Sequence, residues 1–314
     1  MFQSQDRRGA EICDIVEVEK RRQDSAPVVW VLFVVDMRSA KVRSFGRASR
    51  SLEFLAKRAN MFGLERKVVV ITGAGHGLGK EFAAAFAREG ARVAVADIDE
   101  TAASKVAEGI VAGGGESIAV PVDVTSEEST LNMAAQVTRA WGTINVLVNC
   151  AARILRSVQQ PHQPFDKLPI SEWERTFAVN TRGPWLCARA VFPAMKDAGG
   201  GKIINFSSGT FYTGAAFWSH YGASKGAVVG LTRSLARELG PHNIAVNSVS
   251  PSLTMTDATE KLATEYADRI DSMRCFARRQ TPADLIGSIL FLSSHHSDFI
   301  TGQTLNVDGG IIFT

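Results

Sequence analysis

Short apolar runs alternate with longer amphipathic segments along the chain from residue 67 onward. The runs predict strands at residues 68–71, 92–97, 117–122, 145–149, 202–206, 244–249 and 303–307. Apolar positions at helical spacing predict helices at residues 78–89, 100–111, 125–141, 171–195, 221–240 and 281–292. We expect Thr125, Ser171 and Thr281 to mark helix starts, because each opens an S/T-x-x-E pattern or precedes a proline.

Strands joined by helices in this order imply right-handed crossovers and a parallel sheet covered on both faces. The predicted fold is therefore α/β, a single doubly wound parallel-sheet Rossmann domain with helices on both faces. A content of 45% hydrophobic residues is enough for its core. We place this domain at residues 61–314, including a substrate loop at residues 253–280.

Residues 1–60 do not share this alternation. They combine dense mixed charge, an apolar run at residues 28–35 and a basic stretch. We predict a poorly ordered amino-terminal extension, because the run Met61–Leu64 directly precedes the first strong strand. A segment that binds anionic surfaces or acts in targeting is the alternative. It would use Arg38, Lys41, Arg43, Arg47, Arg50, Lys57 and Arg58.

Composition narrows the classes of function. A net charge of +3, without zinc-finger or basic-zipper spacing, argues against nucleic acid as a partner. No apolar run approaches the length of a membrane span, so we expect no span and a cytoplasmic protein. The four cysteines lie far apart and show no metal-ligand spacing, so we expect no metal.

Glycines follow the first predicted strand and open the first helix. The sequence there runs Thr72-Gly-Ala-Gly-His-Gly-Leu-Gly79. Glycine allows a tight turn and a close approach of backbone to a pyrophosphate, whose charge then lies at the positive end of the helix. The loop is thus a candidate dinucleotide site, formed by Gly73, His76, Gly77, Leu78 and Gly79.

The ends of the next strands complete this candidate site. Asp97 can accept both ribose hydroxyls of NAD and would repel the extra phosphate of NADP, and the following Ile98 offers no compensating charge. NAD is therefore the predicted cofactor, with His76 as a weak basic group. Asp123 and Val124 are candidates for the adenine, although Asp123 also suits a plain turn. Asn149, Cys150 and Ala151 are small enough to leave room for a ribose, and no adjacent base marks Cys150 as a nucleophile.

Tyr221 and Lys225 stand four residues apart in a predicted helix and so project from one face. A cation beside the phenol can lower its pKa from about 10 toward neutrality, which would make the tyrosine a usable acid or base. Such a pair is also common on ordinary helix surfaces. The residues around this pair decide whether it is catalytic or an ordinary surface pair.

Those residues give the chain a resemblance to the short-chain dehydrogenase/reductase family. The resemblance rests on the glycine motif, Ser208 ahead of Tyr-x-x-x-Lys, Asn180, and the run Ile300 to Gly310, and it covers residues 61–314. It implies that Tyr221 is the general acid or base, that Lys225 lowers the pKa of Tyr221 and holds the nicotinamide ribose, and that Ser208 binds the reacting oxygen. Asn180 would hold a water beside Lys225.

The segment from Pro251 to Thr256 resembles the family's Pro-Gly-x-x-x-Thr, which lies along the nicotinamide. The implied contacts are Pro251, Leu253, Thr254 and Thr256. Two departures appear: Ser252 replaces the usual glycine, and Cys150 and Ala152 replace residues of Asn-Asn-Ala-Gly. They put details of cofactor geometry in doubt.

The predicted substrate wall is apolar and aromatic and has no obvious Arg or Lys clamp. It comprises Leu155, Phe211, Tyr212, Phe217, Trp218, Leu253 and Met273. This wall suggests a neutral, hydrophobic alcohol or ketone, with an aryl compound as one candidate. The chain looks most like NAD-dependent secondary aryl-alcohol dehydrogenases of the 1-phenylethanol type. A 3-oxoacyl-(acyl-carrier-protein) reductase is the enzymatic alternative, and a non-catalytic NAD-binding regulatory protein is the alternative from another class. The family also implies a homotetramer built through helices that start near Ser171 and Tyr221.

Overall fold

The computed structural model describes residues 15–16, 33–36, 41–43, 61–154, 164–257, 259 and 264–314. The chain divides into two compact units, Met1–Met61 and Phe62–Thr314. The first contains three short antiparallel strands, β1 (Ile15–Val16), β2 (Phe33–Asp36) and β3 (Lys41–Arg43). The rest of residues 1–60 lies outside the described residues, so a poorly ordered arm stays a prediction. The side chains of its basic stretch are likewise outside them.

The second unit contains a seven-stranded sheet in which every neighbouring pair is parallel, in the order β10-β9-β8-β7-β4-β5-β6. This confirms the predicted α/β doubly wound fold. The strands are β4 (Val68–Thr72), β5 (Arg92–Asp97), β6 (Glu116–Pro121), β7 (Val146–Asn149), β8 (Gly201–Phe206), β9 (Ile244–Pro251) and β10 (Thr304–Val307).

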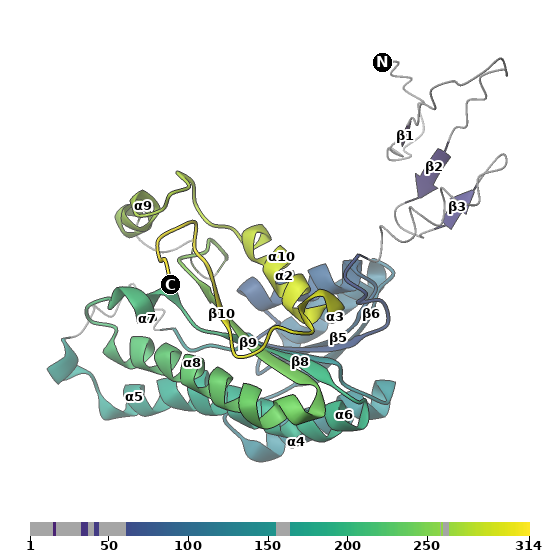
Figure 1. Cartoon of the computed structure of the whole chain (residues 1–314), viewed down its shortest axis with the longest axis horizontal. Helices are drawn as coiled ribbons and strands as arrows, with labels where there is room; N and C mark the ends of the chain where they lie inside the picture. The colour runs from purple at the N-terminus through teal and green to yellow at the C-terminus, as the bar shows by residue number, and fades with distance from the viewer. Residues whose placement is uncertain are drawn as a thin grey trace. The chain divides into compact units, whose positions relative to one another are not determined.

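Helices cover both faces of this sheet (Figure 1). Their bounds are α2 (Gly77–Arg88), α3 (Glu100–Ala112), α4 (Glu127–Trp141), α5 (Ile170–Phe177), α6 (Gly183–Asp197), α7 (Gly209–Thr213), α8 (Ser219–Leu239), α9 (Thr264–Ser272) and α10 (Ala283–Ser293). Helices α4, α6 and α8 pack on one face, where Leu147 and Val246 are fully buried. Helices α2, α3 and α10 pack on the other, around Ile71 and Phe86. The strands read as continuous apolar runs because both of their faces are buried.

The strand order changes direction between β4 and β7, which are neighbours in the sheet but are the first and fourth of its strands along the chain. Ligands of open α/β sheets bind outside the carboxyl ends of the strands at such a switch point. The register places Thr72 of β4 beside Asn149 of β7, and Asn149 beside Asn205 of β8. The loops that follow these strands therefore start from one edge of the sheet.

The single helix predicted over residues 171–195 is present as a continuous helical stretch from Ile170 to Asp197, but it is not a regular α-helix throughout. The structure has α5, a π-helical turn from Ala178 to Arg182, and then α6. Pro184 at the start of α6 has no N–H for the helical ladder, which favours a break before it. Ser171 is not the cap either, since α5 starts at Ile170 after Pro169.

The other two predicted helix starts are displaced by one or two residues. Ser126, and not Thr125, caps α4 by accepting a bond from the Ser129 N–H at 3.2 Å. Helix α10 starts at Ala283. In the described part of the chain no helix is long and apolar enough to cross a membrane.

Candidate active site

The glycine loop joins β4 to α2 in a turn that leaves little space for side chains. A Cβ on Gly79 would lie 2.2 Å from the carbonyl oxygen of Gly73, and one on Gly73 would lie 2.7 Å from the Cα of Ala151. Gly73 and Gly77 also have positive φ angles of 67° and 50°. Glycine is thus required both by conformation and by close approach. His76 precedes the first turn of α2, whose free N–H groups favour a phosphate.

Asp97, at the end of β5, is buried and oriented by the glycine loop. Its Oδ2 accepts the Gly75 N–H at 2.8 Å and its Oδ1 accepts the Asp99 N–H at 3.0 Å. Each carboxylate oxygen keeps a further lone pair for a ribose hydroxyl. His76 lies 3.1 Å from Asp99, a contact with the helix cap that the sequence did not predict. Ile98 is exposed.

At the end of β6, Asp123 acts within a turn. Its Oδ1 accepts bonds from the N–H and the hydroxyl of Thr125 at 2.8 and 2.7 Å. This supports the plain-turn alternative for that oxygen. Val124 is buried next to Gly183, where an added Cβ would lie 3.0 Å from its Cγ2. Contacts of these two residues with an adenine stay predictions.

At the end of β7, the Asn149 side chain is bonded within the protein. Its Nδ2 donates to Asn205 Oδ1 at 2.9 Å and to the Pro184 carbonyl at 3.3 Å. The N–H of Ala151 donates to the Thr72 hydroxyl at 3.2 Å, which ties this loop to the glycine loop. Burial raises the pKa of the Cys150 thiol to about 12. A thiol that stays protonated is a poor nucleophile.

Two neighbouring serines at the end of β8 have different roles. Ser207 donates to the Lys225 carbonyl at 3.0 Å, so its hydroxyl is used in packing α8 on the sheet. Ser208 caps α7, where it accepts the Thr210 N–H at 3.2 Å, and its side chain also hydrogen-bonds Tyr221. The role of Ser208 at the reacting oxygen stays a prediction.

Helix α8 buries Tyr221 and Lys225 on one face, one turn apart. Lys225 Nζ lies 5.8 Å from the centre of the Tyr221 ring and donates to the Phe206 carbonyl at 2.8 Å. Burial raises the pKa of Tyr221 to about 12, against the opposing hydrogen bond from Ser208, and burial lowers the pKa of Lys225 to about 8. The lowered phenol pKa expected from the lysine is absent here, because desolvation outweighs the lowering effect of the Ser208 hydrogen bond.

Asn180 lies in the π-helical turn, which rotates its side chain toward α8. Its Oδ1 accepts the Arg153 N–H at 2.7 Å, and its Nδ2 donates to the Arg153 carbonyl and to the Ser224 hydroxyl, both at 3.1 Å. The Arg153 guanidinium in turn donates to Glu172 at 2.7 Å. Asn180 therefore joins the loop after β7 to the helix of Tyr221. No motif in the sequence predicts the Arg153–Glu172 pair.

The segment after β9 lies over the glycine loop. A Cβ on Gly77 would lie 3.8 Å from Thr256 Oγ1 and from Asp257 Oδ1. Thr254 forms an isolated bridge with Gln280, and its hydroxyl donates to the Ser252 carbonyl at 3.1 Å. Pro251 ends β9, and the Leu253 carbonyl is bonded to Arg274, which the sequence did not single out. The predicted loop thus comes close to the glycine loop.

Aromatic side chains lie on α7 and at the start of α8. Trp218 packs edge-to-face on Tyr221 with ring centres 5.4 Å apart, and Phe211 meets Tyr212 at 4.8 Å. Phe217 and Met273 are exposed, as expected for the wall of an open site. Leu155 lies outside the described residues. The wall as a whole stays a prediction.

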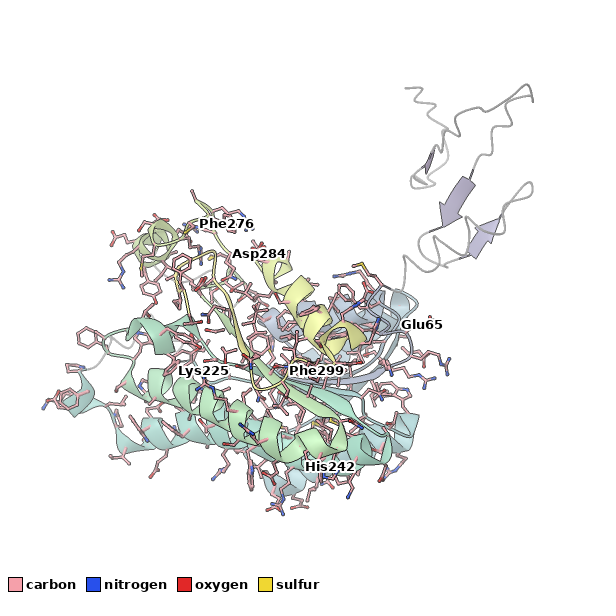
Figure 2. All side chains as sticks on the ribbon, in the orientation of Figure 1. Glu65, Lys225, His242, Phe276, Asp284 and Phe299 are labelled. Carbon is pink, nitrogen blue, oxygen red and sulfur yellow. The ribbon has the colours of Figure 1, made fainter. Side chains whose placement is uncertain are left out.

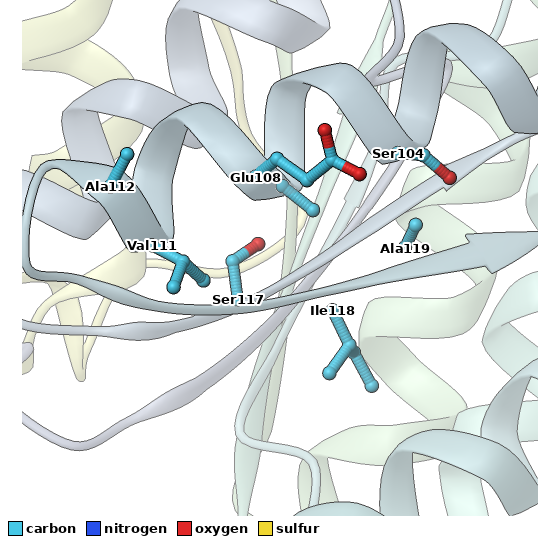
Figure 3. Close-up of a pocket in the computed structure, with 8 residues that line it drawn as sticks. Ser104, Glu108, Val111, Ala112, Ser117, Ile118 and Ala119 are labelled. Carbon is cyan, nitrogen blue, oxygen red and sulfur yellow. The ribbon is translucent and has the colours of Figure 1, made fainter.

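Side chains of the carboxyl-edge loops and of α8 appear in Figure 2, which labels Lys225 on α8 and Phe276 beside α9. A separate hollow of about 440 Å³ lies between α3 and β6 (Figure 3). It is lined by small and apolar side chains with Glu108, and it contains none of the predicted site residues. Within the described ranges, no three His, Cys, Asp or Glu side chains gather as metal ligands.

Fold and site together define the class of protein. A doubly wound sheet presents a glycine cradle, an oriented carboxylate and a buried Ser–Tyr–Lys–Asn group at one edge. The tight Gly73–Gly79 turn and the free lone pairs of Asp97 fit a dinucleotide. These are the features of an oxidoreductase that uses a nicotinamide dinucleotide.

Known proteins place the chain in a family. A family model described as "Enoyl-(Acyl carrier protein) reductase" matches residues 73–312. A probable galactose dehydrogenase of Rhizobium meliloti is 34% identical over 251 residues, covering 79% of this chain and 96% of the relative. A sorbitol dehydrogenase of Cereibacter sphaeroides is 37% identical over 264 residues, covering 79% and 98%.

A solved short-chain type dehydrogenase/reductase from Mycobacterium marinum superposes with a TM-score of 0.74 at 36% identity, covering 81% of this chain and 99% of that one. The chain belongs to the short-chain dehydrogenase/reductase family. It is an oxidoreductase that acts on CH–OH groups and their carbonyl counterparts.

Proposed function

We propose that the protein is an NAD-dependent dehydrogenase of hydrophobic, aryl-type secondary alcohols and the corresponding ketones, with Tyr221 as general acid and base. The observation that carries this proposal is the environment of the phenol. Tyr221 is buried, its phenol hydrogen-bonds Ser208, and the Trp218 ring packs edge-to-face with the Tyr221 ring at a distance of 5.4 Å between ring centres. An aromatic side chain next to the catalytic ring favours a flat, apolar substituent on the substrate.

In alcohol oxidation, Ser208 would hold the hydroxyl oxygen and Tyr221, as the phenolate, would take its proton. A bound nicotinamide would accept the hydride from the carbinol carbon. In the reverse direction the neutral phenol donates its proton to the carbonyl oxygen. Lys225 would hold the cofactor ribose, and Asn180 would keep a path for protons between Lys225 and solvent. The buried setting of these groups supports their roles, because a dry site strengthens each electrostatic contact.

A preference for NAD over NADP is proposed from the ribose end of the site. Asp97 is fixed by two backbone N–H groups, and a 2′-phosphate beside it would meet a buried carboxylate. His76, the basic group nearest in sequence, already contacts Asp99 at 3.1 Å. Ile98 contributes no charge.

A polyol or sugar dehydrogenase is the second candidate. It is favoured by relatives that are described as galactose and sorbitol dehydrogenases. A polyol site needs several hydrogen-bonding side chains around the carbon chain. The Trp218 ring, which packs on Tyr221, favours the aryl substrate instead. An acyl-carrier-protein substrate, suggested by the description of the family model, is a further comparison for the same experiment.

The test is a substrate panel on the full-length protein. The rates of NADH and NADPH formation at 340 nm would be compared for 1-phenylethanol, 2-butanol, sorbitol and galactose, with acetophenone and a 3-oxoacyl thioester as substrates for reduction. We expect kcat/KM for 1-phenylethanol with NAD to exceed that for 2-butanol at least tenfold, because the ring adds roughly 1.5–3 kcal/mol of buried contact. Equal rates for the two alcohols, faster turnover of sorbitol, or a preference for NADP would each contradict the corresponding part of the proposal.

A further inference from the structure

Arg274 is a buried arginine in the turn that follows α9. Its side chain is only 2% exposed. One terminal nitrogen, Nη2, donates to the Ser252 hydroxyl at 2.8 Å and to the Leu253 carbonyl at 2.7 Å. The other, Nη1, donates to the Arg278 carbonyl at 3.2 Å and forms an ion pair with Asp271. Burying a charge is costly unless it is paired and hydrogen-bonded. The contacts of the two terminal nitrogens of Arg274 offset this cost.

Gln280 extends the same contact to the sheet. The Ser252 hydroxyl donates to Gln280 Oε1 at 2.9 Å, and Gln280 Nε2 donates to the Val307 carbonyl at 2.6 Å. The Met255 N–H donates to the Gln280 carbonyl at 2.8 Å. Three segments far apart in the sequence are thereby joined: the loop after β9, the turn after α9 and the end of β10.

Two glycines after β10 make room for this turn. Gly309 has a φ of +74°, and an added Cβ would lie 3.0 Å from Arg274 Cδ. Gly310 has a φ of +85°, and an added Cβ would lie 2.9 Å from Cys275 Sγ. The Cys275 N–H also donates to the Gly309 carbonyl at 2.9 Å. In Figure 2 the neighbouring Phe276 and Asp284 mark where this part of the chain runs from α9 to α10.

We propose that Arg274 is a positioning residue that fastens the nicotinamide loop, residues 251–256, to the substrate segment carrying α9. The Ser252 hydroxyl accepts the hydrogen bond from Arg274, which gives a reason for a serine at a position where the family commonly has glycine. The role of residues 251–256 rests on the proposed function. With the contact in place, the loop that would face the nicotinamide and the segment that would cover the substrate move as one unit.

Arginine is suited to this contact because its planar group reaches Ser252, Leu253 and Asp271 together, whereas lysine offers a single point charge. Removal of the guanidinium leaves the Leu253 carbonyl and the Asp271 carboxylate without this donor. Loss of a buried bond to a charged group then frees the loop. The binding of the dinucleotide should suffer more than the rate of the chemical step.

The experiment measures NADH binding by fluorescence, the KM for NAD and kcat, and amide hydrogen exchange of residues 251–256. Full-length Arg274→Met and Ser252→Gly are compared with the wild type. Arg278→Met is the matched control, since Arg278 loses the same charge on the same turn but pairs with the exposed side of α10 through Asp284. Arg274→Met should raise the NADH Kd and the KM for NAD about tenfold, lower kcat less than threefold and speed exchange at residues 251–256.

Ser252→Gly should weaken NADH binding by a smaller factor, and the double variant should bind no worse than Arg274→Met, because both substitutions remove one shared contact. Unchanged NADH binding in Arg274→Met, or an equal loss in Arg278→Met, would overturn the proposal. If Arg274→Met does not fold, unchanged binding and exchange in Ser252→Gly would overturn it. NADH binding needs no substrate, so a wrong substrate assignment leaves this result readable, whereas a wild type that does not bind NADH refutes the proposed NAD site itself.

Discussion

Tyr221 is buried deeply enough that its phenol stays protonated through the neutral pH range. Burial raises the pKa of Tyr221 to about 12, while burial lowers the pKa of Lys225 to about 8. A neutral phenol can donate a proton to a carbonyl at once. To accept a proton from an alcohol it must first ionise, so the two directions of reaction should respond differently to pH.

For alcohol oxidation, log(kcat/KM) should rise with pH from 6 to 8 with a slope approaching one, because the phenolate fraction grows about tenfold per unit below its pKa. Carbonyl reduction should not rise over that range, since the phenol is already protonated. Initial rates of both reactions, measured with saturating dinucleotide, test this. An oxidation rate that does not rise between pH 6 and 8, where Lys225 still carries its charge, would show that Tyr221 is not the titrating base.

Some site residues could be predicted because their spacing along the chain is informative. The intervals along the chain place Ser208 at a strand end, and place Tyr221 and Lys225 on one helix face. In the structure Ser208 and Tyr221 form a hydrogen bond. Arg274 could not be predicted in this way. Its partners Ser252 and Leu253 are brought to it only by the path of the chain around α9. Asp123 illustrates a third case, in which the sequence left two roles open and the turn role is observed.

At the level of elements, strands were easier to predict than helix boundaries. Each strand is a short run rich in apolar residues, and the inner strands β4, β5, β7, β8 and β9 are largely buried, so the signal is local. The π-helical turn between α5 and α6 is marked locally only by Pro184, and apolar residues continue at helical spacing through the turn. That turn directs Asn180 toward Arg153 and Ser224. The short helices α7 and α9 were expected as loops, since neither is long enough to show a clear period.

The turn into α2 gives a prediction at this level, because Gly79 has no space for a side chain. Gly79→Ala would place a Cβ 2.2 Å from the Gly73 carbonyl oxygen, and the overlap should cost about 1–3 kcal/mol of unfolding free energy and abolish NADH binding. Gly109→Ala is the control, because Gly109 lies within α3 and an added Cβ would meet nothing within 4 Å.

The control should instead gain about 0.5–1 kcal/mol, since alanine favours helix over glycine. Urea unfolding and NADH titration measure both variants. If Gly79→Ala binds NADH like the wild type, the close packing of the glycine loop is not needed for dinucleotide binding.

At the scale of the whole molecule, the folded unit Phe62–Thr314 leaves two tryptophans on one helical face. Trp173 on α5 is 40% exposed and Trp185 on α6 is 42% exposed, and both line a hollow of about 810 Å³ with Phe177 and Leu231. An apolar patch of this kind commonly marks an interface. A Cβ added to Gly230 on α8 would meet nothing within 4 Å, so another helix could pack closely there. Gly226 is covered by the Phe211 ring, so another helix could not pack closely on it.

We therefore predict that copies of the chain associate through α5, α6 and α8, as the proposed homotetramer requires. Trp185→Glu should shift the mass measured by light scattering toward smaller species at micromolar concentration, because a charge would be buried at the interface. Val111→Glu, at an exposed position on α3, should leave the mass unchanged. A wild-type protein that is monomeric under the same conditions would exclude this assembly.

The most direct measurement is the single-turnover rate of acetophenone reduction by NADH-loaded enzyme, in the wild type and in Tyr221→Phe. Phenylalanine keeps the ring that packs on Trp218 and removes only the hydroxyl that serves as acid. The rate should fall by roughly a hundredfold to ten-thousandfold, while the NADH Kd stays within twofold of the wild-type value. A variant that reduces acetophenone at the wild-type rate would show that another group supplies the proton.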